Sequence, residues 1–406
     1  MTVIIERPAY LRKLIRYKDK DLIKVITGVR RCGKSVLLFN IYYEYLLKSG
    51  VPKEHIIRVN LENDVNGQLR NSRSLYQHIT SLMKENNRHY VMIDEIQYID
   101  GFEELVNSLK NNNCDVYITG SNSKMLSGDI STALRGRSME IKVYPLSFAE
   151  YYSFSGGSTR TAFYDYMKYG GFPYVITETD EQNKTEYLQM LEATVAAKDI
   201  IDRYKLRNPG LFSAVYDFLC SNIGALVSAK KIADTLKSSG YKSVTADTIS
   251  NYLAYLCESF LFYRVCRYDI KGKEYLKTLN KYYISDLGLR NAHLNYRQIE
   301  VTHGLENIIY LELLRRGYSV DIGKNREKEI DFVVRSYKDT YYIQAAYSMV
   351  DPDKREQELG SFRKLDDGYK KIVITMDDDP FTLLENGYRK INAIDFLLSE
   401  TALEEI

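Results

Sequence analysis

The chain has 406 residues, of which 45% are hydrophobic and 27% are charged, and its formal net charge is +2. A length above roughly 250–300 residues predicts two or three domains, and this composition excludes a disordered chain. The small net charge permits contact with nucleic acid without requiring it. No apolar run approaches about 18 residues and no signal-peptide core is recognisable, so we expect a cytoplasmic protein with no membrane partner. The five cysteines lack C-x-x-C spacing, which argues against a disulfide framework or a zinc knuckle.

A phosphate-binding loop is predicted near the N-terminus. Residues 28–35 read GVRRCGKS and fit the pattern G-x-x-x-x-G-K-[ST]. An apolar, β-branched run at 22–26 precedes the loop and a helix-like run at 36–47 follows it, which is the context that the pattern requires. The glycines let backbone N–H groups turn inward, and the positive N-terminal end of the helix completes a nest for phosphate. A glycine turn with a coincidental Lys-Ser pair is the alternative.

The chemistry of the loop assigns individual roles. Lys34 would reach the β- and γ-phosphates of ATP, and the Ser35 hydroxyl would hold Mg2+. The predicted nucleotide-binding residues are Gly28, Arg30, Arg31, Cys32, Gly33, Lys34, Ser35, Val36 and, from the acidic element that follows, Asp94.

An acidic element is expected at the end of the next recognisable strand. The apolar run at 90–93 ends in Asp94 and Glu95. Asp94 is suited to the Mg2+ shell, and Glu95 is suited to polarise the attacking water as the general base. Adjacent carboxylates at the end of a buried strand are costly unless a cation or solvent meets them. Solvated acids at a turn are therefore the alternative interpretation.

A further apolar strand at 116–119 leads into a polar cluster at 120–123. Ligands bind at the carboxyl ends of strands in open α/β sheets. Ser121 is therefore our candidate for sensing the γ-phosphate, with Thr119 and Asn122 as alternatives. A plain helix cap is the competing interpretation of this cluster.

Two arginines precede the strand-like run at 139–143. Arg137 is our first candidate, and Arg135 the second, for neutralising transition-state charge, either in cis or from a neighbouring subunit. A surface ion pair is the alternative. Residues 280–283 lack the Asp of an N-K-x-D base reader and lie far from the loop, so we favour adenine over guanine.

Taken together, these segments resemble the AAA-type ATPases of bacteria and archaea, allied to the signal-transducing ATPase lineage, that carry a poorly characterised C-terminal domain. The segments are 28–35, DEIQ at 94–97, TGS at 119–121, GR at 136–137 and YPLSF at 144–148, with later signatures GGFP at 170–173 and YISDLG at 283–288. The resemblance implies an α/β fold: a P-loop NTPase parallel sheet with flanking helices at 1–150, a helical lid at 151–208, a winged helix at 209–290 and a restriction-endonuclease-like α/β domain at 291–406.

The middle of the chain supports the winged helix independently. A short amphipathic helix at 229–236, a second periodic run at 248–260 and a possible hairpin around 271–273 follow one another in the order of that motif. A lid or an interaction surface is the alternative to DNA binding. The candidate phosphate contacts are Lys230, Lys231, Lys237 and Lys242, and the candidate base contacts are Asn251 and Tyr252.

The C-terminal domain departs from the nuclease pattern that its resemblance implies. PD-(D/E)XK domains place a helix Glu, a strand Asp and a next-strand Glu-x-Lys around one metal. Glu306 and Asp331 match the first two positions, but Gln344-Ala345-Ala346 stands at the third. A neutral amide is a poorer Mg2+ ligand than a carboxylate, and Ala346 supplies no cation. We therefore expect a degenerate site, although a migrated lysine such as Lys328 would restore the pattern.

Three functions follow from these features. We favour an ATP-hydrolysing molecular switch that uses Mg2+, couples to a winged helix and a C-terminal region, and binds an unidentified protein partner or DNA, with a homo-oligomer as a possible assembly. An ATP-regulated, metal-dependent DNA nuclease is the second. The third is a nucleotide-binding interaction protein with little turnover.

Overall fold

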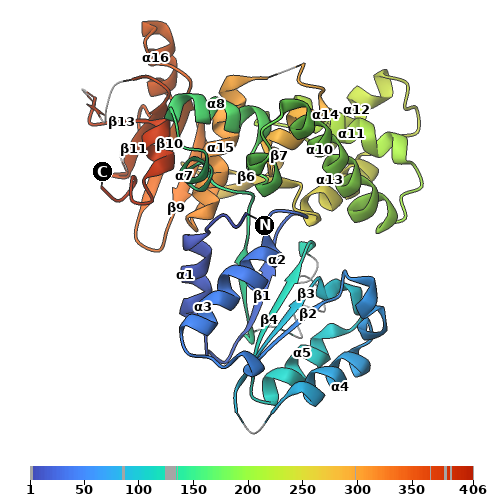
Figure 1. Cartoon of the computed structure of the whole chain (residues 1–406). Coiled ribbons are helices and arrows are strands. Elements are labelled where there is room, and N and C mark those ends of the chain that lie inside the picture. Colours follow the sequence, from blue (N-terminus) through green and yellow to red (C-terminus); the bar gives the residue numbers. More distant parts are fainter. Residues whose placement is uncertain are drawn as a thin grey trace. The chain divides into compact units, whose positions relative to one another are not determined.

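A computed structural model describes residues 3–84, 87–123, 134, 136–297, 299–365, 367–378, 382–384 and 386–405. The chain forms two compact units (Figure 1). The first unit comprises Met1–Pro145 and Glu258–Phe260, and the second comprises Leu146–Cys257 and Leu261–Ile406.

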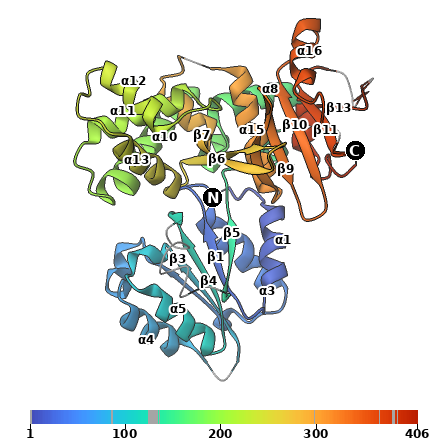
Figure 2. The same cartoon turned by 180° about the vertical axis from the view of Figure 1, so that it is seen from behind.

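The first unit is built on a five-stranded sheet in the order β2-β3-β4-β1-β5, and every pair in it is parallel. Figure 2 shows β5 beside β1. Its strands are β1 (Ile23–Thr27), β2 (Ile56–Asn60), β3 (His89–Asp94), β4 (Cys114–Gly120) and β5 (Ser138–Lys142). The three central strands are buried along their whole length, as expected for a parallel sheet that helices cover on both faces.

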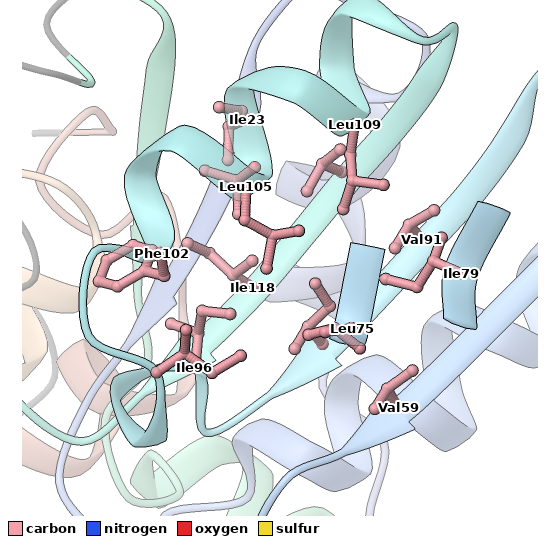
Figure 3. Close-up of a cluster of buried hydrophobic side chains, with 14 of the residues drawn as sticks. Ile23, Val59, Leu75, Ile79, Val91, Ile96, Phe102, Leu105, Leu109 and Ile118 are labelled. Carbon is pink, nitrogen blue, oxygen red and sulfur yellow. The ribbon is translucent and has the colours of Figure 1, made fainter. Parts of the chain in front are cut away.

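Helices cover both faces of this sheet. A continuous helix built from α2, η1 and α3 follows β1, and its Tyr42 packs against Tyr117 of β4, with ring centroids 4.9 Å apart. On the other face, Phe102, Leu105 and Leu109 of α5 point at the strands (Figure 3). The helical elements are α1 (Pro8–Tyr17), α2 (Lys34–Val36), η1 (Leu37–Tyr42), α3 (Tyr43–Lys48), η2 (Lys53–His55), η3 (Asp64–Leu69), α4 (Ser72–Leu82), η4 (Ile96–Tyr98) and α5 (Phe102–Asn111). The predicted parallel sheet with flanking helices is confirmed.

The second unit begins with helices. They are α7 (Phe148–Ser155), α8 (Thr159–Tyr169), α9 (Pro173–Thr177), α10 (Glu181–Thr194), η6 (Val195–Asp202), α11 (Pro209–Ser221), α12 (Ala229–Ser238), α13 (Ala246–Glu258) and α14 (Leu287–His293). His293 joins three of them, because its ring nitrogens lie 3.2 Å from Glu192 Oε1 of α10 and 2.5 Å from Asp217 Oδ1 of α11. Burial alone would lower the pKa of His293, but its hydrogen bonds to the two carboxylates and their charges raise it above the ordinary value.

An eight-stranded mixed sheet in the order β12-β13-β11-β10-β9-β8-β6-β7 follows. Its strands are β6 (Phe262–Asp269), β7 (Glu274–Ile284), β8 (Ser319–Asn325), β9 (Lys328–Arg335), β10 (Thr340–Ala346), β11 (Lys370–Thr375), β12 (Thr382–Leu383) and β13 (Arg389–Asn392). The helices of this region are α15 (Val301–Arg315), α16 (Pro352–Gly360) and α17 (Ala393–Leu398).

The hairpin expected around 271–273 is the antiparallel pair β6–β7, and its position differs from the expectation in one respect. β6 also pairs in parallel with β8 through Arg267–Asp269. The hairpin is therefore continuous with the C-terminal sheet, across the boundary at residue 290 that the resemblance suggested. The hairpin also contacts the segment between α11 and α12, because Val227 and Asn280 of β7 exchange two backbone hydrogen bonds, each 3.0 Å long.

Candidate functional site

The predicted phosphate loop lies at the carboxyl end of the parallel sheet. β1 ends at Thr27 and α2 begins at Lys34, so the loop connects strand and helix as the pattern requires. Gly28 has a φ of 151°, and a Cβ there would lie 2.0 Å from the Val143 carbonyl oxygen. Gly33 has a φ of 101° directly before the helix. Only glycine fits these two positions, because one needs close backbone approach and both need a positive φ.

Lys34 and Ser35 are the residues expected to contact phosphate and Mg2+, respectively. The Lys34 ammonium is buried and donates to the carbonyl oxygens of Gly28 and Val29, at 3.0 and 3.1 Å. It therefore lies inside the curve of the loop, where an anionic ligand would offer it stronger acceptors. The Ser35 hydroxyl donates to Asp94 Oδ1 at 3.0 Å, so the two predicted Mg2+ ligands are adjacent.

Asp94 is the last residue of β3, and Glu95 follows it directly before η4. Asp94 is 1% exposed and accepts a hydrogen bond of 2.5 Å from the Thr119 hydroxyl. The same hydroxyl accepts the Glu95 backbone N–H at 2.9 Å. Burial raises the pKa of Asp94, the Thr119 hydrogen bond opposes this, and the charge of Glu95 adds to it. A cation beside Asp94 would relieve this burial of charge, and two hard oxygen donors suit Mg2+.

Glu95 has a left-handed backbone, with a φ of 56° and a ψ of 51°. A non-glycine residue in this region costs of order 1–3 kcal/mol and persists where the surrounding structure imposes it. At this turn the Thr119 hydroxyl accepts the Glu95 N–H. The backbone therefore fixes the position of the candidate general base.

Gln97 is a site residue that the sequence did not single out. Its Nε2 donates to Glu95 Oε2 and lies 3.5 Å from the Ser121 hydroxyl, so it bridges the candidate base and the candidate sensor. Its Oε1 is buried and finds no hydrogen-bond partner among the described residues. The DEIQ sequence at 94–97 was the signal that could have identified Gln97. η4 begins directly after Glu95, and its tight turn brings Gln97 back beside Glu95.

Arg7 is a second residue that the sequence did not single out. Its guanidinium is buried over the Tyr10 ring, 4.5 Å from the ring centroid. It donates to the carbonyl oxygen of Cys32 in the loop at 3.1 Å and to that of Tyr144 at 2.9 Å. The segment before α1 therefore holds the outer side of the loop. The contact between Arg7 and Tyr144 joins residues that are 137 positions apart, so no local sequence pattern predicts it.

The other predicted loop residues differ in their exposure to solvent. Arg30 forms an ion pair of 3.0 Å with Glu62, and Arg31 is exposed with a φ of 65°. Cys32 is buried, with its thiol 3.4 Å from the Val143 carbonyl oxygen, and Val36 is half-buried at the end of α2.

Arg137 does not lie with these residues. It directly precedes β5, and its carbonyl oxygen accepts the N–H of Ile23, the first residue of β1, at 2.7 Å. The loop follows Thr27, the last residue of β1. Arg137 is therefore exposed at the amino end of the sheet, roughly 15 Å of strand away from the loop at about 3.3 Å per residue. Arg135 lies outside the described residues.

The C-terminal residues of the expected nuclease pattern come together. The Asp331 backbone N–H donates to Gln344 Oε1 at 2.8 Å, and Asp331 Oδ2 accepts the Ala345 N–H at 2.9 Å. Glu306 Oε1 and Asp331 Oδ1 lie 2.8 and 3.7 Å from the same atom, Lys281 Nζ. Lys328, the expected migrated lysine, is exposed instead and its ammonium lies beside Gly360.

The charges of this cluster shift its pKa values in opposite directions. Burial alone would raise the pKa of Glu306, but the Lys281 ammonium lowers it to about 2. Burial and the charge of Glu306 together raise the pKa of Asp331 to about 8. The Lys281 ammonium therefore favours the charged form of Glu306, whereas burial and the charge of Glu306 disfavour the charged form of Asp331.

The candidate DNA contacts divide into two groups. Tyr252 is 6% exposed and packs edge-on against Phe212, so it belongs to the core of the helices and is not available to a base; that part of the prediction is wrong. Asn251 is exposed on the same helix. The four candidate phosphate contacts are also exposed, and they are Lys230, Lys231, Lys237 and Lys242.

The later family signatures form one buried junction. Asp286 accepts the N–H groups of Gly171 at 2.7 Å and Gly288 at 2.8 Å. A Cβ on Gly170 would lie 1.8 Å from Asp286 Oδ1, and a Cβ on Gly288 would lie 2.1 Å from the Tyr169 carbonyl oxygen. These residues therefore fasten α8 to the start of α14.

Two general properties complete the description. Within the described ranges, none of the helices combines the length and the apolar character needed to cross a membrane. Among the same residues, no group of three or more His, Cys, Asp or Glu side chains is arranged to hold a metal ion.

Comparison with known proteins places this site in a family. Residues 20–152 match the family model described as an AAA domain, and residues 160–300 match a domain of unknown function (DUF8612). An uncharacterized protein of Haemophilus influenzae is 40% identical over 402 residues, which span 97% of this chain and 99% of that protein. An uncharacterized protein of Methanocaldococcus jannaschii is 30% identical over 397 residues, which span 92% of this chain and 85% of that protein.

Solved structures show distant similarity. The Aeropyrum pernix Orc1 protein, solved in complex with DNA, is 13% identical with a TM-score of 0.28, covering 72% of this chain and 93% of that one. Cdc6p from Pyrobaculum aerophilum is 11% identical with a TM-score of 0.32, covering 73% and 94%. The AAA-domain match and the two full-length relatives establish that the chain belongs to a family of AAA-type P-loop ATPases.

Proposed function

We propose that the protein is an ATP-hydrolysing molecular switch. The observation that carries this proposal is the hydrogen-bonded set Ser35–Asp94–Thr119–Glu95, which joins the phosphate loop to the ends of β3 and β4. It unites a hydroxyl suited to bind Mg2+, a buried carboxylate and a second carboxylate on a strained turn. This combination suits hydrolysis, because water must be oriented as well as phosphate bound.

Each residue has a distinct task in this proposal. Bound Mg2+ would neutralise charge on the β- and γ-phosphates, and Ser35 and Asp94 would hold it. Lys34 would turn from the loop carbonyls to the phosphate oxygens. Glu95 would accept a proton from the attacking water, and Ser121, buried at the end of β4, would contact the γ-phosphate.

A phosphate-release assay with ATP and Mg2+ tests this proposal. We expect multiple turnovers in the wild type and none in Lys34→Ala. The matched control is Lys48→Ala, which removes an exposed lysine of α3 and should leave the rate unchanged. Absence of turnover in the wild type would favour the nucleotide-binding interaction protein instead.

We also propose that the second unit contains a winged helix. The order α11, α12, α13 and then the β6–β7 hairpin supports it, as does the isolated antiparallel bridge between Val227 and Asn280, which joins the segment between α11 and α12 to β7 of the hairpin. The exposed lysines on α12 would contact phosphate. DNA affinity should therefore fall steeply with salt, and Lys230→Glu with Lys231→Glu should weaken it. Equal affinity in that double variant would indicate a protein partner instead.

The position of Arg137 supports a role between subunits. At the amino end of its own sheet it does not reach its own loop, whereas an exposed arginine is available to a neighbouring subunit. Specific ATPase activity should then rise with protein concentration and should be lost in Arg137→Ala. Activity that is independent of concentration would contradict this assembly.

A further inference from the structure

A lysine from the β6–β7 hairpin fills the centre of the C-terminal acidic cluster. Lys281 Nζ lies 2.8 Å from Glu306 Oε1, 2.7 Å from Glu329 Oε1 and 3.7 Å from Asp331 Oδ1. The Lys281 side chain is only 4% exposed. An ammonium has three N–H donors and no acceptor, and here three carboxylates converge on it.

The residues present do not fit a divalent metal. Mg2+ requires oxygen ligands at about 2.0–2.1 Å in near-octahedral geometry, and the point where these carboxylates meet is already held by a cation. The third expected ligand is committed as well. Gln344 Oε1 accepts the Asp331 N–H, and Gln344 Nε2 donates to Glu358 Oε2, both at 2.8 Å.

The lysine also supplies a connection that the sheet lacks. β7 and β9 are not neighbours, because β6 and β8 lie between them in the strand order. Lys281 nevertheless reaches Glu329 and Asp331 of β9. Tyr283, two residues along and therefore on the same face of β7, donates to Glu306 of α15 at 2.5 Å. Two side chains of one strand thus bind β7 to α15, and one of them continues to β9.

We propose that Lys281 is the resident cation of this site: its ammonium stands in place of a divalent metal, and the cluster fastens the hairpin to the C-terminal sheet. Metal-dependent cleavage of nucleic acid is therefore absent from this domain. The proposal concerns the second unit alone and is independent of ATP hydrolysis.

Manganese binding to the nucleotide-free full chain tests the proposal, with electron paramagnetic resonance counting bound Mn2+. We expect the wild type and Asp331→Asn to bind the same amount. Lys281→Met should gain one Mn2+ per chain, and Lys281→Met with Asp331→Asn should lose it again. Lys324→Met is the matched control. Lys324 of β8 is partly exposed, and its ammonium lies 3.7 Å from Asp269 Oδ2 of β6. This variant should gain no Mn2+.

Thermal melting provides a second readout. Lys281→Met should melt at a lower temperature than the wild type without metal, and Mn2+ should restore part of the loss. If Lys281→Met does not fold, the variant that adds Glu306→Gln should fold, because it also removes the charge of a carboxylate that has lost its lysine partner. The proposal is overturned by wild-type Mn2+ binding that Asp331→Asn abolishes. A folded Lys281→Met that gains no Mn2+ would overturn it equally. So would a Lys281→Met, Glu306→Gln double variant that is no more stable than Lys281→Met alone.

Discussion

Replacing Thr119 with valine should disconnect the two acidic residues of the nucleotide site. The Thr119 hydroxyl donates to Asp94 and accepts the Glu95 N–H, and the residue is fully buried. Valine keeps the shape of the side chain. It removes a hydrogen bond to a charged group, which is worth about 1.5–3 kcal/mol, and leaves a buried N–H without a partner, at about 1–3 kcal/mol.

Burial of the added methyl group recovers about 0.8 kcal/mol, so a net loss of about 2–5 kcal/mol is expected. For a unit of this size, that loss corresponds to a fall of roughly 4–20 °C in melting temperature. Because Glu95 also loses its anchor, kcat should fall roughly 100-fold.

Thr119→Ser is the matched control, because it keeps the hydroxyl and loses only a methyl group. Melting temperature, amide hydrogen exchange in β3 and β4, and phosphate release should be compared in both variants. We expect Thr119→Ser to stay near the wild type in kcat and Thr119→Val to show faster exchange at the ends of both strands. Equal stability and equal kcat in the two variants would refute the assigned role of the hydroxyl.

Three further predictions concern other contacts. Gln97→Ala should lower kcat roughly tenfold with little change in ATP affinity, since it positions the base and does not touch the loop; unchanged kcat would contradict this. His293→Gln should cost most stability below pH 6.5, where the histidine is charged, and the difference in stability from the wild type should shrink as the pH rises through the raised pKa of His293 and its ion pairs are lost. A difference in stability that does not depend on pH would refute these ion pairs. Gly170→Ala should lower the melting temperature far more than Gly156→Ala: both glycines end a helix with similar positive φ angles, 76° and 63°, but only a Cβ on Gly170 would collide with Asp286. Equal losses in the two variants would contradict this.

The nucleotide site could be predicted from sequence because its parts are local. A phosphate loop is set by the glycines and the strand and helix that flank it, and Asp94 and Glu95 end an apolar run that can only be a buried strand. Since parallel strands bring their carboxyl ends to one edge, the chain order of these segments was enough to predict that Ser35, Asp94 and Ser121 lie at the same edge of the sheet.

The remaining features depend on contacts between distant segments. Arg7 meets the loop through backbone carbonyls, which no side-chain pattern records. Lys281 contacts Glu306 and Asp331 although β6 and β8 lie between β7 and β9 in the strand order, and no local pattern predicts a contact of that kind, so the sequence suggested Lys328 instead. The location of Arg137 needed the strand register, which sets it at the start of β5 and not at its end.

The most direct test of the central claim is ATP binding and phosphate release measured side by side in the wild type and in Glu95→Gln. The glutamine keeps the size of the side chain and its hydrogen bonding but cannot accept a proton from water. We predict that both proteins bind ATP with Mg2+ at similar affinity and that only the wild type releases phosphate over many turnovers. Turnover by Glu95→Gln at the wild-type rate, or no turnover by either protein, would contradict the account.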